Sequence, residues 1–535
     1  MGNQVETSAD YVIAGGGSAG CVLAYRLSED PRNRVVLLEA GGSSDRFWVN
    51  LPAGLARNVG NPDINWFHMT EPDPTLGGRQ VIWHAGKMLG GGSALNGMVY
   101  IRGARYDYDG WAALGCTGWS WNEVVPYFLR AETFEGAPSQ THGSSGPLGV
   151  APLRVVHPLA EAFLKSCGEV GMSRIADYCE GDVDGAFINL ATQRNGRRSS
   201  TAASYLADAR GRPNLRVITD ALVDRVLFDD GRASGVAYRL GGVEHVVSAA
   251  REVIVSAGTM QSPAILMRSG VGPGAHLRAM DVAVHTDLQE VGRNLTEHPN
   301  IQNSRLVSTP TYNAIRNPFR LAMEGLNYIL FRRGMLSTAA VHAMAHARSS
   351  PDAPHPDIKL QMMPFCSDPE TGASHRRSGI GVTIDNMFPK ARGEIRLRSP
   401  RPQDKPVIDY RMYEHPEDLA VMRAGLRLVD RIFAAPGIAE HVTGRIFPPS
   451  ADLSDDQLDV LIRAHSATGL HPVSSCRMGA DAASVVDPQL RVRGVDRLRV
   501  IDASVMPTLP SANTNAPTIM IAEKGAELIK AASHA

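Results

Sequence analysis

The stretch Asp10-Tyr-Val-Ile-Ala-Gly15-Gly-Gly17-Ser-Ala-Gly20 carries the strongest structural signal, because a short apolar run leads directly into a G-x-G-x-x-G loop. The apolar run predicts a buried strand, and the apolar residues after the loop recur at helical spacing. A second apolar run, Val35–Leu38, ends at Glu39. The sequence therefore predicts a β-α-β unit of the kind that binds nucleotides.

The glycines of this loop suit the pyrophosphate of a dinucleotide, since they permit a tight turn, close approach of the ligand and close helix–strand packing. Glu39 is placed to accept hydrogen bonds from an adenosine ribose. A glycine-rich turn without a ligand is the alternative, and the motif does not separate NAD from FAD, because both contain ADP. The expected nucleotide contacts are Gly15, Gly17, Ser18, Ala19, Gly20, Glu39 and Ala40.

The bulk properties narrow the class of protein. A chain of 535 residues exceeds the roughly 250–300 residues at which one hydrophobic core stops growing, so two lobes are expected. A net charge of -1 argues against a nucleic-acid partner. No run is apolar enough to span a bilayer or to act as a secretory signal, so the expectation is a soluble cytoplasmic protein. Six scattered cysteines indicate buried thiols rather than disulfides or a metal site.

Further segments could form a ligand site with the first unit. A second glycine-rich loop runs from Gly86 to Gly103, and a predicted strand from Glu252 ends at the small residues Ala257 and Gly258. Exposed backbone amides in such loops suit a phosphate or a flat ring, although an ordinary surface turn would have the same composition. The contacts expected here are Gly90, Gly91, Ser93, Asn96, Gly97, Met98, Val99, Ala257 and Gly258.

The C-terminal region repeats this arrangement of a strand followed by a helix. Leu498–Ile501 predicts a strand that ends at Asp502 and Ala503, and a helix is expected with Asn515 as its N-cap and Pro517 and Thr518 in its first turn. The positive end of that helix would stabilise a reduced flavin if it points at the ring. An ordinary capped helix is the alternative.

Together, these segments resemble the glucose–methanol–choline (GMC) oxidoreductase family along nearly the whole chain. Gly86–Asp109 is similar to its first signature and Gly258–Gly272 to its second, with smaller matches at Gly292–His298, Asp487-Pro and Asp502–Ser504. The resemblance implies an α/β (overall α+β) fold: a Rossmann-like FAD-binding domain at 1–149, 201–295 and 461–535. A discontinuous substrate domain, with an antiparallel sheet flanked by helices, is expected at 150–200 and 296–460.

The resemblance also bears on how FAD is held. Val223 is similar to the position whose backbone meets the adenine. Some members attach FAD through a histidine just before the first signature, and this chain has Trp83 at that position with His84 next to it. Because a shift of one residue normally points a side chain elsewhere, we expect noncovalent FAD.

His471 and Asn513 are the expected catalytic pair. One histidine among 17 is more often structural than catalytic, and it is the family's His-Pro segment that singles out His471, with Asn513 lying 42 residues (513 − 471) downstream. The resemblance implies that both lie over the reactive edge of the flavin. A histidine can accept the hydroxyl proton as hydride leaves the carbon, and an asparagine amide can orient the oxygen.

The expected reaction is oxidation of an alcohol, with a primary alcohol of modest size as the preferred substrate and a dehydrogenase preferred over an H2O2-forming oxidase. The acceptor, whether oxygen, quinone or a dye-like carrier, and the oligomeric state are not fixed. A hydroxynitrile lyase or a noncatalytic flavoprotein is the alternative. Leu470, Ser474, Met323–Phe331 and Leu360–Phe365 could form pocket walls or simply core. No cage for a choline-like cation is evident, and no metal site is expected.

Overall fold

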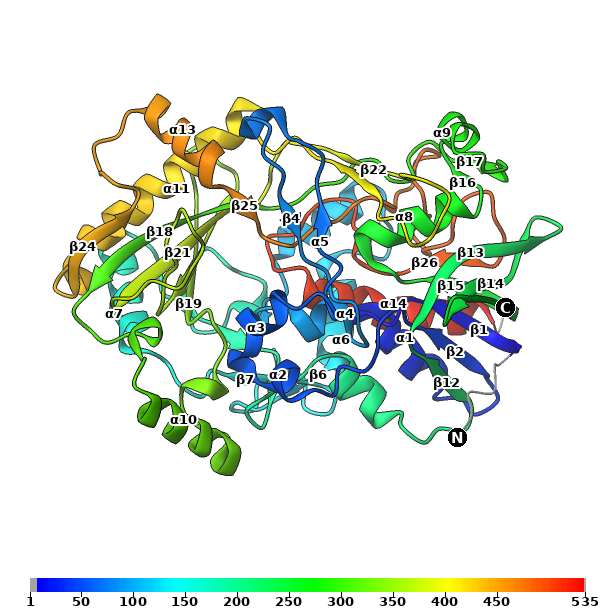
Figure 1. Ribbon diagram of the computed structural model, residues 1–535, viewed down its shortest axis with the longest axis horizontal. Coiled ribbons are helices and arrows are strands. Elements are labelled where there is room, and N and C mark those ends of the chain that lie inside the picture. Colours follow the sequence, from blue (N-terminus) through cyan, green and yellow to red (C-terminus); the bar gives the residue numbers. More distant parts are fainter. Residues whose placement is uncertain (1–6, 534–535) are drawn as a thin grey trace.

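The computed structural model describes residues 7–533, which form two lobes, each built on its own sheet (Figure 1). The first sheet has the strand order β12-β2-β1-β15-β14-β13, with β26 also paired to β15. Its pairs β12–β2, β2–β1, β1–β15 and β15–β26 are parallel. The bounds are β1 Ser8–Ala14, β2 Val35–Leu38, β12 Leu215–Ile218, β13 Ala221–Asp229, β14 Arg232–Leu240, β15 Val243–Val255 and β26 Leu498–Val500.

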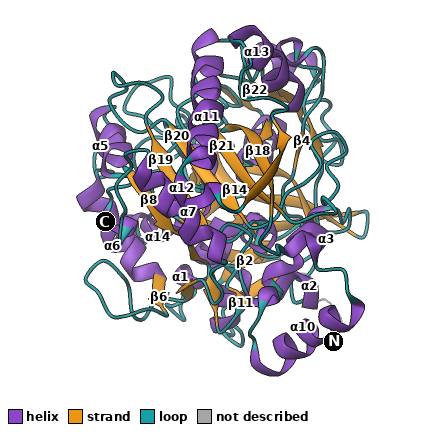
Figure 2. Cartoon of the chain, turned by 90° about the vertical axis from the view of Figure 1, so that its left-hand side faces the viewer, coloured by secondary structure: helices purple, strands orange, loops and turns teal. Residues whose placement is uncertain are grey.

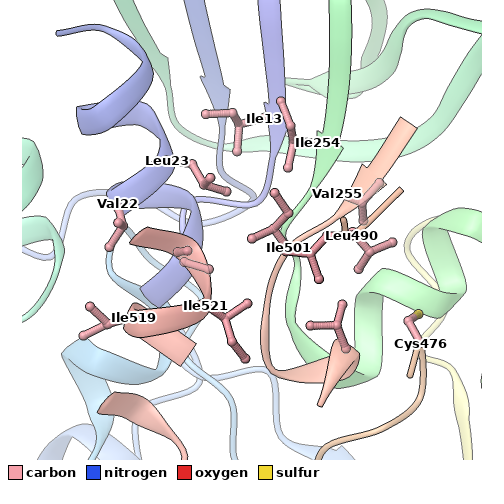
Figure 3. Close-up of a cluster of buried hydrophobic side chains, with 14 of the residues drawn as sticks. Ile13, Val22, Leu23, Ile254, Val255, Cys476, Leu490, Ile501, Ile519 and Ile521 are labelled. Carbon is pink, nitrogen blue, oxygen red and sulfur yellow. The ribbon is translucent and has the colours of Figure 1, made fainter. Parts of the chain in front are cut away.

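The predicted β-α-β unit is present. Helix α1 (Ser18–Leu27) follows β1, and helix α14 (Asn515–Ala532) from the other end of the chain packs beside it. Ile13 of β1, Val22 of α1 and Ile519 of α14 converge on one core, together with residues of β15 (Figure 3). The parallel strands are apolar along their lengths because neighbouring elements cover both of their faces.

The second sheet is antiparallel, with the strand order β24-β18-β21-β20-β19-β8 and β25 paired to β18. Helices α7 and α11 cover its apolar face (Figure 2). The bounds are β8 Gly185–Ile188, β18 Pro299–Val307, β19 Ala343–Ala347, β20 Ile358–Met363, β21 Gly379–Asn386, β24 Val442–Phe447, β25 Ala467–Thr468, α7 Pro158–Glu169 and α11 Pro416–Ala434.

Shorter elements complete the fold. A four-stranded sheet contains β5 Val99–Tyr100, β6 Glu132–Phe134, β7 Leu148–Pro152 and β9 Leu190–Ala191. The remaining strands are β3 His68–Met69, β4 Ile82–Trp83, β10 Gln193–Arg194, β11 Arg197–Arg198, β16 Val271–Gly272, β17 Thr286–Asp287, β22 Glu394–Arg396 and β23 Val407–Asp409. The remaining α-helices are α2 Phe47–Asn50, α3 Leu55–Val59, α4 Gly91–Leu95, α5 Arg105–Ala113, α6 Trp121–Ala131, α8 Gly258–Arg268, α9 Gly274–Ala279, α10 Pro318–Phe331, α12 Pro436–Ala439 and α13 Asp455–His465.

Three expectations from the sequence can be compared directly with these elements. All six cysteines are buried free thiols, as predicted. Among residues 7–533, no helix is long and apolar enough to cross a bilayer. The predicted N-cap of α14 is wrong, because Thr514 occupies that position and Asn515 is the first helical residue. Asn515 instead uses its side chain to accept a hydrogen bond from Ser18 (3.0 Å), which joins α14 to α1.

Candidate active site

A cavity of about 590 Å³ lies between the two sheets. Residues that follow the C-terminal ends of β1, β2, β15 and β26 line one side, and residues of β18, β20 and β21 line the other. This is where ligands bind in open α/β sheets, just beyond the carboxyl ends of the strands. The volume falls within the range typical of small-molecule sites.

Most of the residues predicted from the sequence meet in this cavity. The two proposed catalytic residues line it, as do all but four of the expected cofactor contacts: His471, Asn513, Gly15, Gly17, Ser18, Ala19, Glu39, Ala40, Gly91, Asn96, Gly97, Met98, Val99, Val223, Ala257, Gly258, Asp502, Ala503, Asn515 and Thr518. The four that do not line it are Gly20, Gly90, Ser93 and Pro517.

Pro517 is buried in the first turn of α14, and the other three shape the glycine loops. The Gly90 N–H donates to the Gly16 carbonyl at 2.8 Å, which fixes the second glycine loop to the first. A Cβ on Gly20 would lie 1.9 Å from the Gly15 carbonyl oxygen, so only glycine allows the helix to pack this closely. Ser93 donates to the Gly90 carbonyl at 2.6 Å. Their contribution is therefore to the shape of the loops.

The glycine loops leave backbone exposed to the cavity, as a flavin nucleotide requires. Gly15 adopts a φ of +110°, and a Cβ there would lie 2.5 Å from the Ser256 carbonyl oxygen. Gly92 and Gly97 both line the cavity, and a Cβ on either would meet no atom within 4 Å. Anions bind readily at the N-terminus of a helix such as α1, and flat rings can lie against bare backbone. The residues present thus fit FAD.

Glu39 is buried at the end of β2, and its carboxylate already accepts two backbone N–H groups. The donors are Gly16 at 2.9 Å and Gly41 at 2.8 Å. Burial raises the pKa of this carboxyl group to about 7, against the lowering effect of the two amides. Its contact with an adenosine ribose stays a prediction.

Asp502 fixes the turn that follows β26 and lines the cavity. One carboxylate oxygen accepts from the Gly258 N–H (2.8 Å) and the Ser262 hydroxyl (2.6 Å), and the other accepts from the Ser504 N–H (2.8 Å). Because these donors belong to α8 and to the turn itself, Asp502 holds two distant segments together.

His471 is buried on the cavity wall and is held on two sides. Its backbone N–H donates to both carboxylate oxygens of Glu297, at 2.8 and 2.9 Å. Its Nδ1 atom lies 3.1 Å from Nδ1 of His298, whose Nε2 atom lies 3.1 Å from the Met387 carbonyl oxygen. Burial, with a smaller contribution from the charge of Lys359, holds the pKa of His471 well below its usual range.

The side chain of Asn513 contacts Lys359, a residue that the sequence interpretation missed. The Lys359 ammonium group is fully buried, 3.5 Å from Asn513 Oδ1 and 3.6 Å from Asp385 Oδ2. An ammonium group can only donate, so the amide oxygen of Asn513 faces it. The amide nitrogen of Asn513 is thereby left for the cavity, which this residue lines.

Strand pairing explains how these polar groups come together. His346, Lys359, Asp385 and Asn300 lie opposite one another across β19, β20, β21 and β18. The next row on the same face contains Gln361 and Thr383, which line the cavity, whereas the alternate residues Ile358, Leu360 and Met362 are in the core. In the sequence, the alternation of polar and apolar residues over 358–363 could have indicated a strand with one polar face, and hence the polar group at Lys359.

His84 and Trp83 depart from expectation. Trp83 is buried and packs edge-on against Tyr410, whereas His84 lines the cavity and its Nδ1 lies 2.8 Å from the amide nitrogen of Asn65. The expectation that the shift of one residue points His84 away from the cofactor site is therefore wrong, because the side chains of Trp83 and His84 alternate and it is Trp83 that points away from the cavity, into the core. Noncovalent binding of FAD stays a prediction.

The proposed pocket walls are corrected in part. Leu470, Gln361 and Met363 line the cavity, whereas Ser474 donates to the Met506 carbonyl at 2.8 Å and does not line it. Met323–Phe331 forms neither wall nor core, because within it only Tyr328 is buried.

Comparison with known proteins decides the family. Profiles described as GMC oxidoreductase match residues 9–300 and 389–522. The chain belongs to the GMC oxidoreductase family. As a member, it is a flavoprotein oxidoreductase that uses FAD and acts on CH–OH groups.

Two curated GMC relatives match nearly the whole chain. It is 39% identical to the alcohol dehydrogenase [acceptor] of Pseudomonas putida and 38% identical to the oxygen-dependent choline dehydrogenase of Rhizobium etli (strain CIAT 652), and each match covers 97% of this chain and 95% of the relative. Among solved GMC structures, pyridoxine 4-oxidase from "Mesorbium loti" superposes with a TM-score of 0.88 at 30% identity, covering 97% of this chain and 98% of that one.

Proposed function

We propose that this GMC oxidoreductase oxidises an uncharged primary alcohol of modest size to its aldehyde, with His471 as the base. The observation that carries the proposal is the hydrogen-bonded series Met387–His298–His471 beside the cavity. The donor and acceptor roles in this series leave one ring nitrogen of His471 free to accept a proton from the expected substrate.

The direction of each hydrogen bond follows from the Met387 carbonyl, which can only accept. His298 Nε2 must therefore carry a hydrogen and donate to it. Burial holds the pKa of His298 well below its usual range, so the ring is neutral and its Nδ1 is an acceptor. His471 Nδ1 then donates to His298, and His471 Nε2 keeps its lone pair. This tautomer is the one that a general base requires.

Asn513 has the complementary task of orienting the alcohol. With its amide oxygen facing Lys359, its NH2 group can donate to the substrate oxygen and set the angle of the reacting carbon–hydrogen bond. When bound, FAD supplies the hydride acceptor. The hydroxyl proton goes to His471 Nε2, and typical general-base assistance of this kind is worth about 10²–10⁴-fold in rate.

The substrate side of the cavity favours an uncharged molecule. Its polar side chains, Asn300, Gln361 and Thr383, are neutral. The carboxylates that line the cavity, Glu39 and Asp502, belong to the expected flavin side. A quaternary ammonium ion is usually recognised by carboxylates or an aromatic cage. Of the Phe, Tyr and Trp residues that the structure describes, Trp66 alone lines the cavity, and one ring does not form a cage. This arrangement supports an alcohol other than choline, although one relative is named for choline.

Gln361 offers a hydrogen-bond acceptor on this side of the cavity. Its amide nitrogen donates to Asp385 at 2.7 Å, so its oxygen is free to accept. A second hydroxyl or an amine hydrogen on the alcohol would find a partner there. For the electron acceptor, we propose a carrier other than oxygen, supported by the relative named alcohol dehydrogenase [acceptor].

Anaerobic mixing with a panel of neutral alcohols and choline tests the proposal. Neutral primary alcohols should bleach the bound flavin, choline should not, and reoxidation should be faster with a quinone or dye than with oxygen. A flavin that stays yellow with every alcohol would indicate a lyase or a noncatalytic protein instead. Cytoplasmic location and the two-domain boundaries given above remain part of the proposal.

A further inference from the structure

Helix α10 (Pro318–Phe331) has an unusual distribution of apolar side chains. Seven of its large apolar residues are exposed, and only Tyr328 is buried. Phe319 is 74% exposed and Phe331 is 63% exposed. Both views show the helix standing away from the body of the molecule (Figures 1 and 2). Burial within this chain therefore does not explain its composition.

Helix α2 (Phe47–Asn50) extends the same surface. Phe47 and Trp48 are exposed, and the ring centroids of Phe47 and Tyr328 lie 6.4 Å apart. We name the combined set the α10 surface: Phe47, Trp48, Phe319, Leu321, Met323, Leu326, Ile329, Leu330 and Phe331. An exposed apolar patch of this kind marks a site of interaction with another protein or a membrane.

The charges around the α10 surface are mainly positive. Arg316 and Arg320 lie at the start of the helix, and Arg332 and Arg333 follow its end. None of these four makes an ion pair within residues 7–533, and Glu324 is the only acidic residue from 312 to 334. The Arg57 guanidinium carbon lies 4.6 Å from the centroid of the Trp48 ring, so Arg57 adds a further cation to this surface.

We propose that the α10 surface binds the enzyme to the face of an anionic lipid bilayer without crossing it. A helix of 14 residues is about 21 Å long, shorter than the roughly 30 Å hydrocarbon core. Apolar side chains with Trp and Phe can enter the headgroup boundary while arginines meet the lipid phosphates.

A second copy of this chain fits the same surface poorly. Symmetric pairing would bring two copies of the same surface together and place arginine against arginine. Anionic lipid phosphates complement these charges instead, and this is the reason for preferring a bilayer.

The α10 surface also lies close to the cavity along the chain. Helix α10 leads through the short helix Met335–Ser337 to Ala340 and Val341, which line the cavity. The proposal itself does not depend on which alcohol or acceptor the enzyme uses.

Flotation of the FAD-loaded full chain with vesicles tests the proposal. Wild type should float with vesicles of phosphatidylcholine and phosphatidylglycerol and much less with phosphatidylcholine alone. Leu326→Asp with Ile329→Asp should weaken binding by on the order of 100-fold, since two apolar contacts are lost. Arg320→Gln with Arg333→Gln should weaken binding roughly fivefold per charge removed, on the anionic vesicles only.

The matched control replaces exposed apolar residues elsewhere, Val243→Asp with Val460→Asp, and should float like wild type. Bound-flavin absorbance equal to that of wild type shows that each variant is folded. Equal flotation of wild type and the Leu326/Ile329 variant would overturn the proposal. So would a wild-type dimer that ignores vesicles and dissociates in that variant, since the occupant would then be a second copy.

Discussion

Replacing Lys359 by methionine removes a buried charge that contacts both Asn513 and Asp385. Without the ammonium group, the Asn513 amide loses the contact that directs its NH2 group into the cavity. Hydrogen bonds to charged groups typically contribute about 1.5–3 kcal/mol, so flavin reduction by alcohol should slow by roughly 10–100-fold. Stopped-flow absorbance of the anaerobic enzyme measures this rate.

The pH dependence separates this role from a general loss of packing. Lys359 is a secondary cause, after burial, of the depressed pKa of His471. Removing the positive charge raises that pKa, and a base is active only when unprotonated. The acidic limb of the rate profile should therefore move to higher pH in Lys359→Met. An unmoved limb together with an unchanged rate in the folded variant would refute the reasoning.

Stability needs its own control, because Lys359→Met leaves Asp385 buried without its cation. Such unpaired charges typically cost about 3–5 kcal/mol of unfolding free energy. The double variant Lys359→Met/Asp385→Asn should recover most of that loss, without recovering the orientation of Asn513. Lys390→Met breaks an exposed ion pair with Glu417 and should change neither stability nor kinetics appreciably.

Three further predictions concern other residues. Asn513→Ala should slow flavin reduction less than His471→Ala does, with the flavin spectrum retained; loss of bound flavin on gel filtration would mean that its role is structural. Acid precipitation should release all the flavin into the supernatant, and yellow protein in the pellet would show attachment through a residue such as His84. Although burial alone would lower it, Asp177 and Glu132 raise the pKa of His142 from 6.5 to about 9. His142 should therefore stabilise the fold fully below pH 6.5 and lose that contribution as pH rises through about 9, by on the order of 1–2 kcal/mol after solvent screening. The difference in unfolding free energy between wild type and His142→Gln across this range measures it, and a constant difference would contradict the assignment.

Local sequence patterns predicted the nucleotide-binding half well. The strand at Val35–Leu38 has the predicted bounds, and the helix expected after the glycine loop is present, although it begins at Ser18, within the loop motif. Both elements depend mainly on neighbouring residues. The N-cap of α14 was missed by one position, since Thr514 and Asn515 are both plausible caps and the local sequence does not distinguish them.

Long-range contacts were harder to predict. His298 and His471 are 173 residues apart, and Lys359 and Asn513 are 154 apart, so no local pattern pairs them. The register of an antiparallel sheet brings Lys359 opposite Asp385, and that register is not evident from one strand alone. The apolar composition of Met323–Phe331 suggested a pocket wall or part of the core, because apolar residues are usually buried. In the structure most of these side chains are exposed.

The central claim is that His471 takes the hydroxyl proton, and anaerobic reduction of the flavin in His471→Ala tests it most directly. The variant should keep the absorbance of bound flavin. Its reduction by the best alcohol should be about 10²–10⁴-fold slower than that of wild type. Reduction at the wild-type rate would contradict the account.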